Sequence, residues 1–177
     1  MKFLPICLLL PAAIAMAQEN PLSAFNKRAY GQIKSWVLTS AEKMPEANYG
    51  FKPTDSVRSF GEIAGHLADV QYMFCSVVLG EKSPAPKIEG VKTAKSDLLA
   101  ALKDSGAYCD RAYNTMTDAS SVQTVKFYAG DMPKLSILQV NIAHMSEHYG
   151  NLVTYLRMKN IVPPSTEMMQ AAQPKKQ

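Results

Sequence analysis

The sequence predicts an all-α protein, a four-helix bundle with a crossover between its third and fourth helices. Four segments carry apolar residues at alternating steps of three and four, the spacing that forms one face of an α-helix. Capping residues, prolines and glycines separate these segments. We expect residues 18–167 to form this single domain, because their number is typical of one domain rather than two.

The first 17 residues predict a secretory signal peptide. Lys2 precedes an apolar run from residue 3 to residue 14, and Ala15-Met16-Ala17 matches an A-x-A cleavage site. The run is shorter than the roughly 20 apolar residues that a membrane-spanning helix requires. We therefore expect cleavage after Ala17 and a periplasmic or secreted protein that is not embedded in a membrane.

The first predicted helix covers residues 21–44, with Asn20 as its N-cap and a proline at its first position. A connector rich in Gly, Pro, Asn and Asp follows it. The second helix starts at a capping box in which Ser59 is the N-cap and Glu62 lies three positions on. Gly80 marks the end of this helix.

The third predicted helix, capped by Thr93 or Ser96, continues to about Thr117. After it comes a crossover with a short β-like run at residues 122–128 and a turn at residues 130–131. We expect this crossover to be extended, with a little strand character.

The last predicted helix runs from Pro133 to about Asn160 and is stopped by the prolines at 163–164. The Gln- and Lys-rich tail, residues 168–177, is expected to be disordered. The apolar seam of this helix consists of Leu135, Leu138, Ile142, Met145, Tyr149, Leu152 and Leu156.

All three histidines of the chain lie just off the apolar seams of predicted helices. His144 and His148 are four residues apart on the last helix, so their Cβ atoms lie about 5–6 Å apart on one face. When the seams are written as heptads, His66 on the second helix takes the same position as His148. The pattern predicts that the three meet in a shared metal site; a hydrogen-bonded polar cluster is the alternative.

Three neutral imidazoles are a ligand set for a divalent ion such as Zn²⁺, Ni²⁺ or Fe²⁺, and they leave at least one coordination position for water or substrate. Glu62 and Asp69 lie one helical turn from His66 and are candidates for orienting it. Glu147 is a candidate proton acceptor, although its helical phase is also typical of a solvated residue. No catalytic residue is assigned beyond these three carboxylates.

Residues 144–148 also match H-x-x-E-H, a metalloprotease signature. Such enzymes need an acidic third ligand downstream, and the only acid after His148 is Glu167, which we expect to lie at the edge of the tail. A protease is therefore disfavoured.

The sequence resembles the DinB-like proteins, bacterial four-helix bundles with a three-histidine divalent metal site. The resemblance is strongest in YGFKPTDSVRSFGEIAGH and in HMSEHYGNLVTYLRMKNIVPP, where H-x-x-x-H is followed by YLR and a Pro-Pro stop. It implies that His66, His144 and His148 are the metal ligands. The group includes thiol-dependent transferases and isomerases, so the resemblance does not specify one reaction. Relatives often pair through helix faces, so it also allows a homodimer.

Charge and cysteine content narrow the remaining possibilities. Loss of Lys2 with the signal peptide lowers the formal net charge from +4 to +3, too little to indicate nucleic-acid binding. Export would permit a disulfide between Cys75 and Cys109, although two buried free thiols is the simpler interpretation. We expect a metal-dependent hydrolase or transferase with a small-molecule substrate. The alternatives are a non-catalytic periplasmic metal- or ligand-binding bundle and a metal-free structural or partner-binding bundle.

Overall fold

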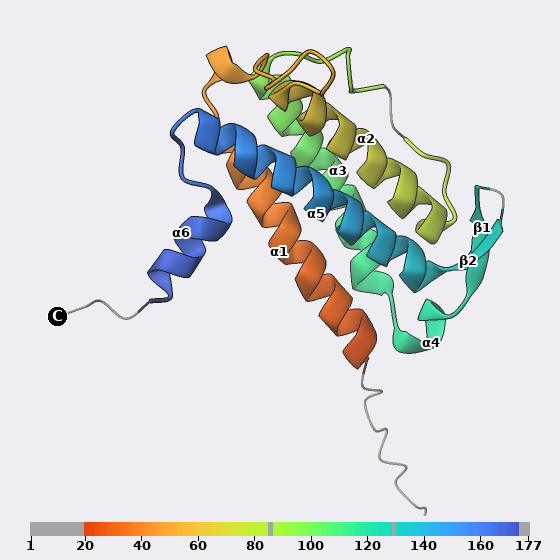
Figure 1. Ribbon diagram of the computed structural model, residues 1–177. Helices are drawn as coiled ribbons and strands as arrows, with labels where there is room; N and C mark the ends of the chain where they lie inside the picture. Colours follow the sequence, from red (N-terminus) through yellow and green to blue (C-terminus); the bar gives the residue numbers. More distant parts are fainter. Residues whose placement is uncertain (1–19, 85–86, 129, 174–177) are drawn as a thin grey trace, which may run out of the picture.

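A computed structural model describes residues 20–84, 87–128 and 130–173. Within them, four long helices pack side by side as a bundle (Figure 1), which confirms the predicted all-α class and the four-helix architecture. They are α1 (Pro21–Lys43), α2 (Phe60–Leu79), α3 (Lys95–Thr115) and α5 (Lys134–Met158). Shorter elements join or extend them: a 3₁₀ turn (Glu46–Asn48), α4 (Asp118–Ser121), β1 (Thr124–Phe127), β2 (Gly130–Pro133) and α6 (Pro164–Ala171).

The bundle is held together by the apolar seams that the sequence predicts. In α2 the seam residues Ile63 and Leu67 are fully buried, and in α5 Met145, Leu152 and Leu156 are. Burial of such side chains stabilises each by about 1.5–3 kcal/mol relative to exposure. The packing sets the rotation of α2 and α5 about their axes, and therefore the direction in which the neighbouring histidines point.

The ends of the helices follow the capping chemistry only in part. The predicted capping box opens α2: Ser59 Oγ accepts from the backbone N–H of Glu62 at 3.2 Å, and Glu62 Oε2 accepts from the backbone N–H of Ser59 at 2.7 Å. Gly80 ends α2 in the left-handed conformation, with φ of 71°. The prediction for α3 is wrong, because Ala94, and neither Thr93 nor Ser96, occupies its N-cap.

The N-terminus of α1 is capped by a residue from the crossover. Asn20 occupies the N-cap position, as predicted, but its side chain makes no capping hydrogen bond to its own helix. The carboxylate of Asp118 instead accepts hydrogen bonds from the backbone N–H groups of Leu22 at 3.1 Å and Ser23 at 2.8 Å. In return, Asn20 Oδ1 accepts from the backbone N–H of Asp118 at 2.8 Å. This exchange ties the start of the first helix to α4.

The predicted crossover between the third and fourth long helices is present and contains an antiparallel hairpin. Strands β1 and β2 pair from Thr124 with Pro133 to Phe127 with Gly130. The expected strand character is confirmed, but the turn comes earlier than predicted, because Gly130 and Asp131 already belong to β2.

The C-terminal segment differs from the prediction. Met168 and the three residues after it belong to α6, whereas the disordered tail was expected to begin at residue 168. The helix is held against α5 and α1: Tyr149 donates its hydroxyl hydrogen bond to Ser165 Oγ at 2.8 Å, and Lys43 pairs with Glu167. Among the described residues, no helix is both long and apolar enough to cross a membrane. The predicted signal peptide lies outside the described residues.

A disulfide joins α2 to α3. Cys75 and Cys109 are bonded across 34 residues of sequence, with their Cα atoms 5.2 Å apart, and neither is accessible to solvent. The interpretation as two free thiols is therefore wrong, although both residues are buried as it required. Sequence could not decide between the two because their approach depends on how α2 packs against α3.

Candidate metal centre

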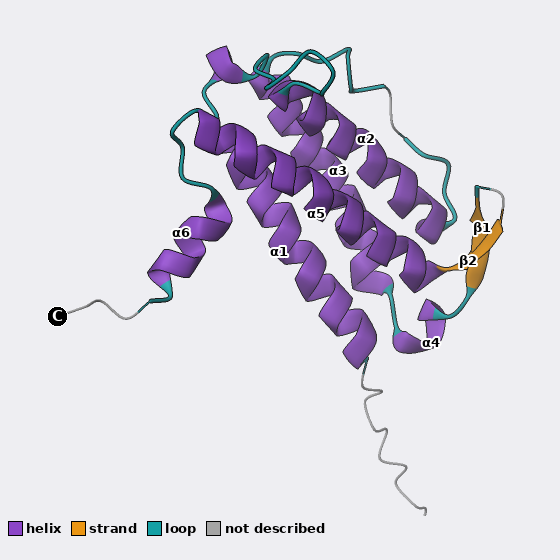
Figure 2. Ribbon diagram, in the orientation of Figure 1, coloured by secondary structure: helices purple, strands orange, loops and turns teal. Residues whose placement is uncertain are grey.

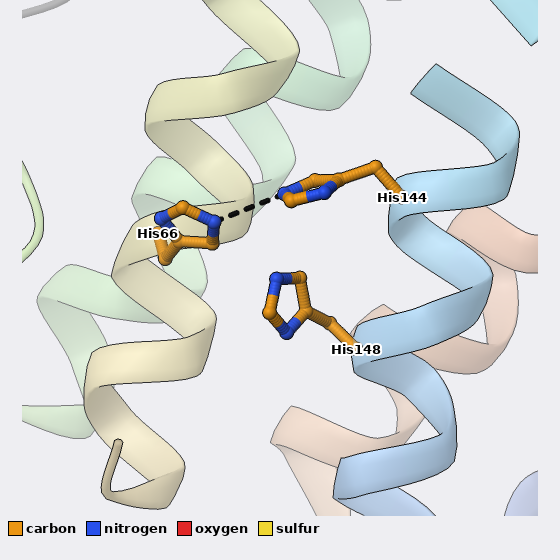
Figure 3. Close-up of side chains that lie close together, drawn as sticks. All are labelled: His66, His144 and His148. Carbon is orange, nitrogen blue, oxygen red and sulfur yellow. Dashed lines mark hydrogen bonds between the residues drawn. The ribbon is translucent and has the colours of Figure 1, made fainter. Parts of the chain in front are cut away.

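The three histidines converge in the gap between α2 and α5. His66 extends from α2, and His144 and His148 extend from successive turns of α5 toward it (Figure 3). One nitrogen from each imidazole lies within 4.8 Å of those of the other two. The Nε2 atoms of His66 and His144 are 2.9 Å apart. The structure thus confirms that the three side chains meet, as the matching heptad positions predict.

The three imidazoles pack against one another, with His148 buried and His66 and His144 half-buried. His148 is 7% exposed, and its ring lies edge-on to those of His66 and His144, with centroid separations of 4.8 Å and 4.5 Å. The ring of Phe74 adds an apolar neighbour to His144 at 6.2 Å. Burial of this kind disfavours a charged imidazolium.

Burial keeps two of the three histidines neutral. Loss of hydration, followed by the positive charges that His144 and His66 can carry, lowers the pKa of His148 to about 4. Loss of hydration and the neighbouring His66 also lower the pKa of His144. Both imidazoles therefore keep a free lone pair at neutral pH, which is the form that binds a metal ion.

The carboxylate in contact with His66 is Glu89, which sequence analysis missed. Glu89 Oε2 lies 2.9 Å from His66 Nδ1, and Arg58 Nε donates to Glu89 Oε1 at 2.6 Å. Burial raises the pKa of Glu89, but the hydrogen bonds from Arg58 and His66 outweigh that effect and lower it overall. Glu89 belongs to the connector between α2 and α3, which runs back along α2 (Figure 2).

Of the three carboxylates that the sequence suggested, Glu62 and Asp69 hold backbone groups rather than His66. Glu62 accepts from the backbone at the start of α2, and this bond and the Ser59 side chain lower its pKa. Asp69 accepts from the backbone N–H groups of Ile88 and Glu89 in the connector. Neither therefore orients His66 directly. Glu147 is exposed at the edge of the site.

A polar cavity of about 630 Å³ opens beside His148. Its walls come from α2, α5 and the two connectors that flank α2, and Tyr155 is among the uncharged residues. The walls carry charges of both signs, from Lys52, Asp55, Arg58, Glu62, Glu89 and Glu147. The Tyr155 hydroxyl donates to the backbone carbonyl of Arg58 at 2.8 Å, which links α5 to the loop before α2. A small polar molecule could therefore approach His148 from this side.

The donor set fits a divalent metal ion. Three imidazole nitrogens converge on one point, and neutral histidine is a common ligand of Zn²⁺, Ni²⁺ and Fe²⁺. The protease interpretation of residues 144–148 loses its third ligand, because Glu167 pairs with Lys43 in the contact of α6 with α1. The third member of the cluster is instead His66.

Comparisons with known proteins give the same fold. Residues 35–152 match the family model of the DinB superfamily. A DinB-like protein from Bacillus cereus has a TM-score of 0.70 at 14% identity, over 78% of this chain and 93% of that one. A DinB-like protein from Bacillus subtilis has a TM-score of 0.67 at 19% identity, over 80% and 97%.

A mycothiol-dependent maleylpyruvate isomerase is also similar, with a TM-score of 0.61 at 14% identity. The alignment covers 73% of this chain but only 60% of the isomerase. No curated protein matches. At these identities the structural likenesses concern the fold.

Proposed function

The chain belongs to the DinB superfamily, and from that premise we propose that it is an exported metal-dependent enzyme in which His66, His144 and His148 hold a divalent ion. The observation that supports the proposal best is the approach of three imidazole nitrogens to within 4.8 Å of one another. The polar cavity beside His148 is large enough for a small-molecule substrate to approach the cluster at that residue. We assign the reaction class as hydrolysis or group transfer.

A divalent ion at this site would supply a Lewis acid next to the cavity. The protein's own groups then have distinct tasks. The lowered pKa values of His144 and His148 keep their lone pairs available at neutral pH. Arg58 brings a positive charge to the cavity wall, and the exposed carboxylate of Glu147 on the same wall is the candidate proton acceptor.

The cavity supports catalysis over simple metal storage. A storage or structural site is usually closed by a fourth protein ligand, whereas a catalytic site keeps a position open. Among the described residues, the cluster that could hold an ion consists of three histidines. We therefore prefer an enzyme to a non-catalytic metal-binding bundle.

Export is supported by two independent features of the chain. The N-terminal residues have the pattern of a signal peptide. The disulfide between Cys75 and Cys109 is typical of oxidising compartments. The isomerase among the structural neighbours is mycothiol-dependent, but low-molecular-weight thiols are mainly intracellular. We therefore favour a reaction that does not need such a thiol.

The metal content of the purified protein tests the proposed three-histidine site. The mature protein should be loaded separately with Zn²⁺, Ni²⁺, Fe²⁺ or Mn²⁺, dialysed, and analysed by mass spectrometry beside His66→Ala and His144→Ala. We expect about one ion per wild-type chain, a large loss in both variants, and unchanged helical circular dichroism. Equal metal content in wild type and variants would refute the site, and no binding by any of them would leave a metal-free bundle.

A further inference from the structure

We propose that Glu89 is a positioning residue of this centre: it holds the imidazole of His66 with the proton on Nδ1, so that the lone pair on Nε2 faces His144 and His148. The inference rests on the proposed metal site, but it concerns a residue from the connector rather than from the bundle. Its test separates the two, because the position of the imidazole proton can be observed without metal.

The contacts at the two nitrogens of His66 require this tautomer. An ionised carboxylate can only accept a hydrogen bond, so Nδ1, 2.9 Å from Glu89 Oε2, must be the donor. A neutral imidazole has one N–H group, which leaves Nε2 with its lone pair. That atom lies 2.9 Å from His144 Nε2, on the side of the other two histidines. Without Glu89, the contact between His66 and His144 would also allow the proton of His66 to sit on Nε2. An imidazole protonated at Nε2 cannot bind an ion through that atom.

The connector that carries Glu89 is anchored at the height of His66. Asp69, about one turn further along α2, accepts from the backbone N–H groups of Ile88 at 3.0 Å and Glu89 at 2.9 Å. Ile88 is 2% exposed, so its side chain fixes the connector in the core. Gly65 allows the close approach, because a Cβ atom there would lie 3.0 Å from the Cα of Glu89. Gly90, which follows Glu89 in the chain, has a φ of +75°, a backbone conformation that favours glycine.

The side chain of Glu89 is also fixed at its outer oxygen. Arg58 Nε donates to Oε1 at 2.6 Å, while Oε2 is left for His66. The backbone of Arg58 is in turn held by the hydroxyl of Tyr155 from α5. The pair of Arg58 and Glu89 is partly exposed and would contribute little to stability by itself. Its geometric effect is the more important one, since it orients the carboxylate toward His66.

The test uses three substitutions at matched positions. Glu89→Ala removes the carboxylate, and Glu89→Gln keeps an oxygen that can accept from Nδ1–H. Glu81→Ala is the control, because Glu81 lies in the same connector and pairs with Arg111 rather than with a histidine. Zn²⁺ affinity would be measured by competition with a chelator, and the proton position by nitrogen–proton correlation spectra of metal-free protein. The signals would be assigned from His144→Gln and His148→Gln.

We expect Glu89→Ala to bind Zn²⁺ about 10- to 100-fold more weakly and to convert part of His66 to the tautomer protonated at Nε2. Glu89→Gln should lose less affinity and keep the wild-type tautomer, and Glu81→Ala should match wild type in both. Wild-type affinity in Glu89→Ala, equal losses in its Ala and Gln variants, or His66 protonated at Nε2 in the wild type would each overturn the role of Glu89. If the wild type binds no Zn²⁺ yet shows His66 protonated at Nδ1, the proposed metal site fails while the positioning contact stands.

Discussion

Cys75 and Cys109 cross-link α2 and α3 through a disulfide that is buried between the two helices. The bond closes a loop that contains the connector and its Glu89, and closing a loop of this length reduces the entropy of the unfolded chain. The double variant Cys75→Ala/Cys109→Ala should therefore be less stable by about 2–4 kcal/mol. Urea unfolding of the variant and of the wild type measures the difference. The same unfolding midpoint in both would show that the bond does not form in the purified protein.

The metal-free protein should lose stability as the pH falls from about 6.5 toward 4. His148 has a pKa of about 4 in the folded protein, whereas an unfolded histidine titrates near pH 6.5. Between these values the unfolded chain binds more protons than the folded one. The stabilising contribution is therefore complete above the unfolded pKa and is lost as the pH falls through the folded pKa.

The pH effect can be isolated by comparing wild type with His148→Gln in a chelating buffer. Unfolding free energies from urea titrations near neutral pH and near pH about 5 should differ more in the wild type than in the variant. Carboxylates titrate in both proteins, so their contribution cancels in the comparison. Identical pH dependence would contradict the lowered pKa.

Asp118→Ala should lower the melting temperature, because it leaves the N–H groups of Leu22 and Ser23 without their acceptor. Asp118→Asn retains an oxygen that can cap the helix and should recover part of the loss. Asp104→Ala, on the exposed face of α3, is the matched control and should leave the melting temperature unchanged. If Asp118→Ala had the same melting temperature as Asp104→Ala, the contact between α4 and α1 would not stabilise the fold.

Two glycine substitutions test the close approach of the connector. Gly65→Ala should destabilise the protein by about 1–3 kcal/mol, because the added methyl group would contact the backbone of Glu89 at 3.0–3.2 Å. It should also weaken Zn²⁺ binding by displacing Glu89. Gly31→Ala, in the middle of α1 with open space around it, should stabilise by up to about 1 kcal/mol. Urea unfolding and chelator competition on both variants check these signs, and equal behaviour of the two would exclude a tight contact at Gly65.

The bundle and the histidine cluster could be predicted because both depend on helical periodicity. A repeat of three and four places Leu138, Met145 and Leu152 on one face of α5, and that face must be buried. Once it is buried, the phase of His144 and His148 relative to α2 follows. Asn141 precedes His144 by three residues and so lies on the same face of α5, yet it is buried against α3, with its Nδ2 donating to the hydroxyl of Tyr113. The face of α5 that carries the histidines therefore extends beyond the histidine cluster.

Glu89 could not be predicted because a connector has no period that selects one of its residues. Its position depends on two contacts between segments that are distant in sequence. Asp69 accepts hydrogen bonds from two backbone N–H groups of the connector, and Gly65 has no side chain where the backbone of Glu89 passes. Helix α6 was missed for a similar reason. Its sequence is typical of a polar tail, and the contacts of Ser165 with Tyr149 and of Glu167 with Lys43 become visible only in the folded chain.

The separation of His66 from His144 by 78 residues determines when an ion can be acquired. One imidazole of the cluster lies in the second long helix and two lie in the last, so a chain still being synthesised has no complete cluster. Loading must follow the docking of α5 onto α2. For the proposed metal site, the supply of ions where folding is completed, together with the preferences of the three imidazoles, would then select the ion.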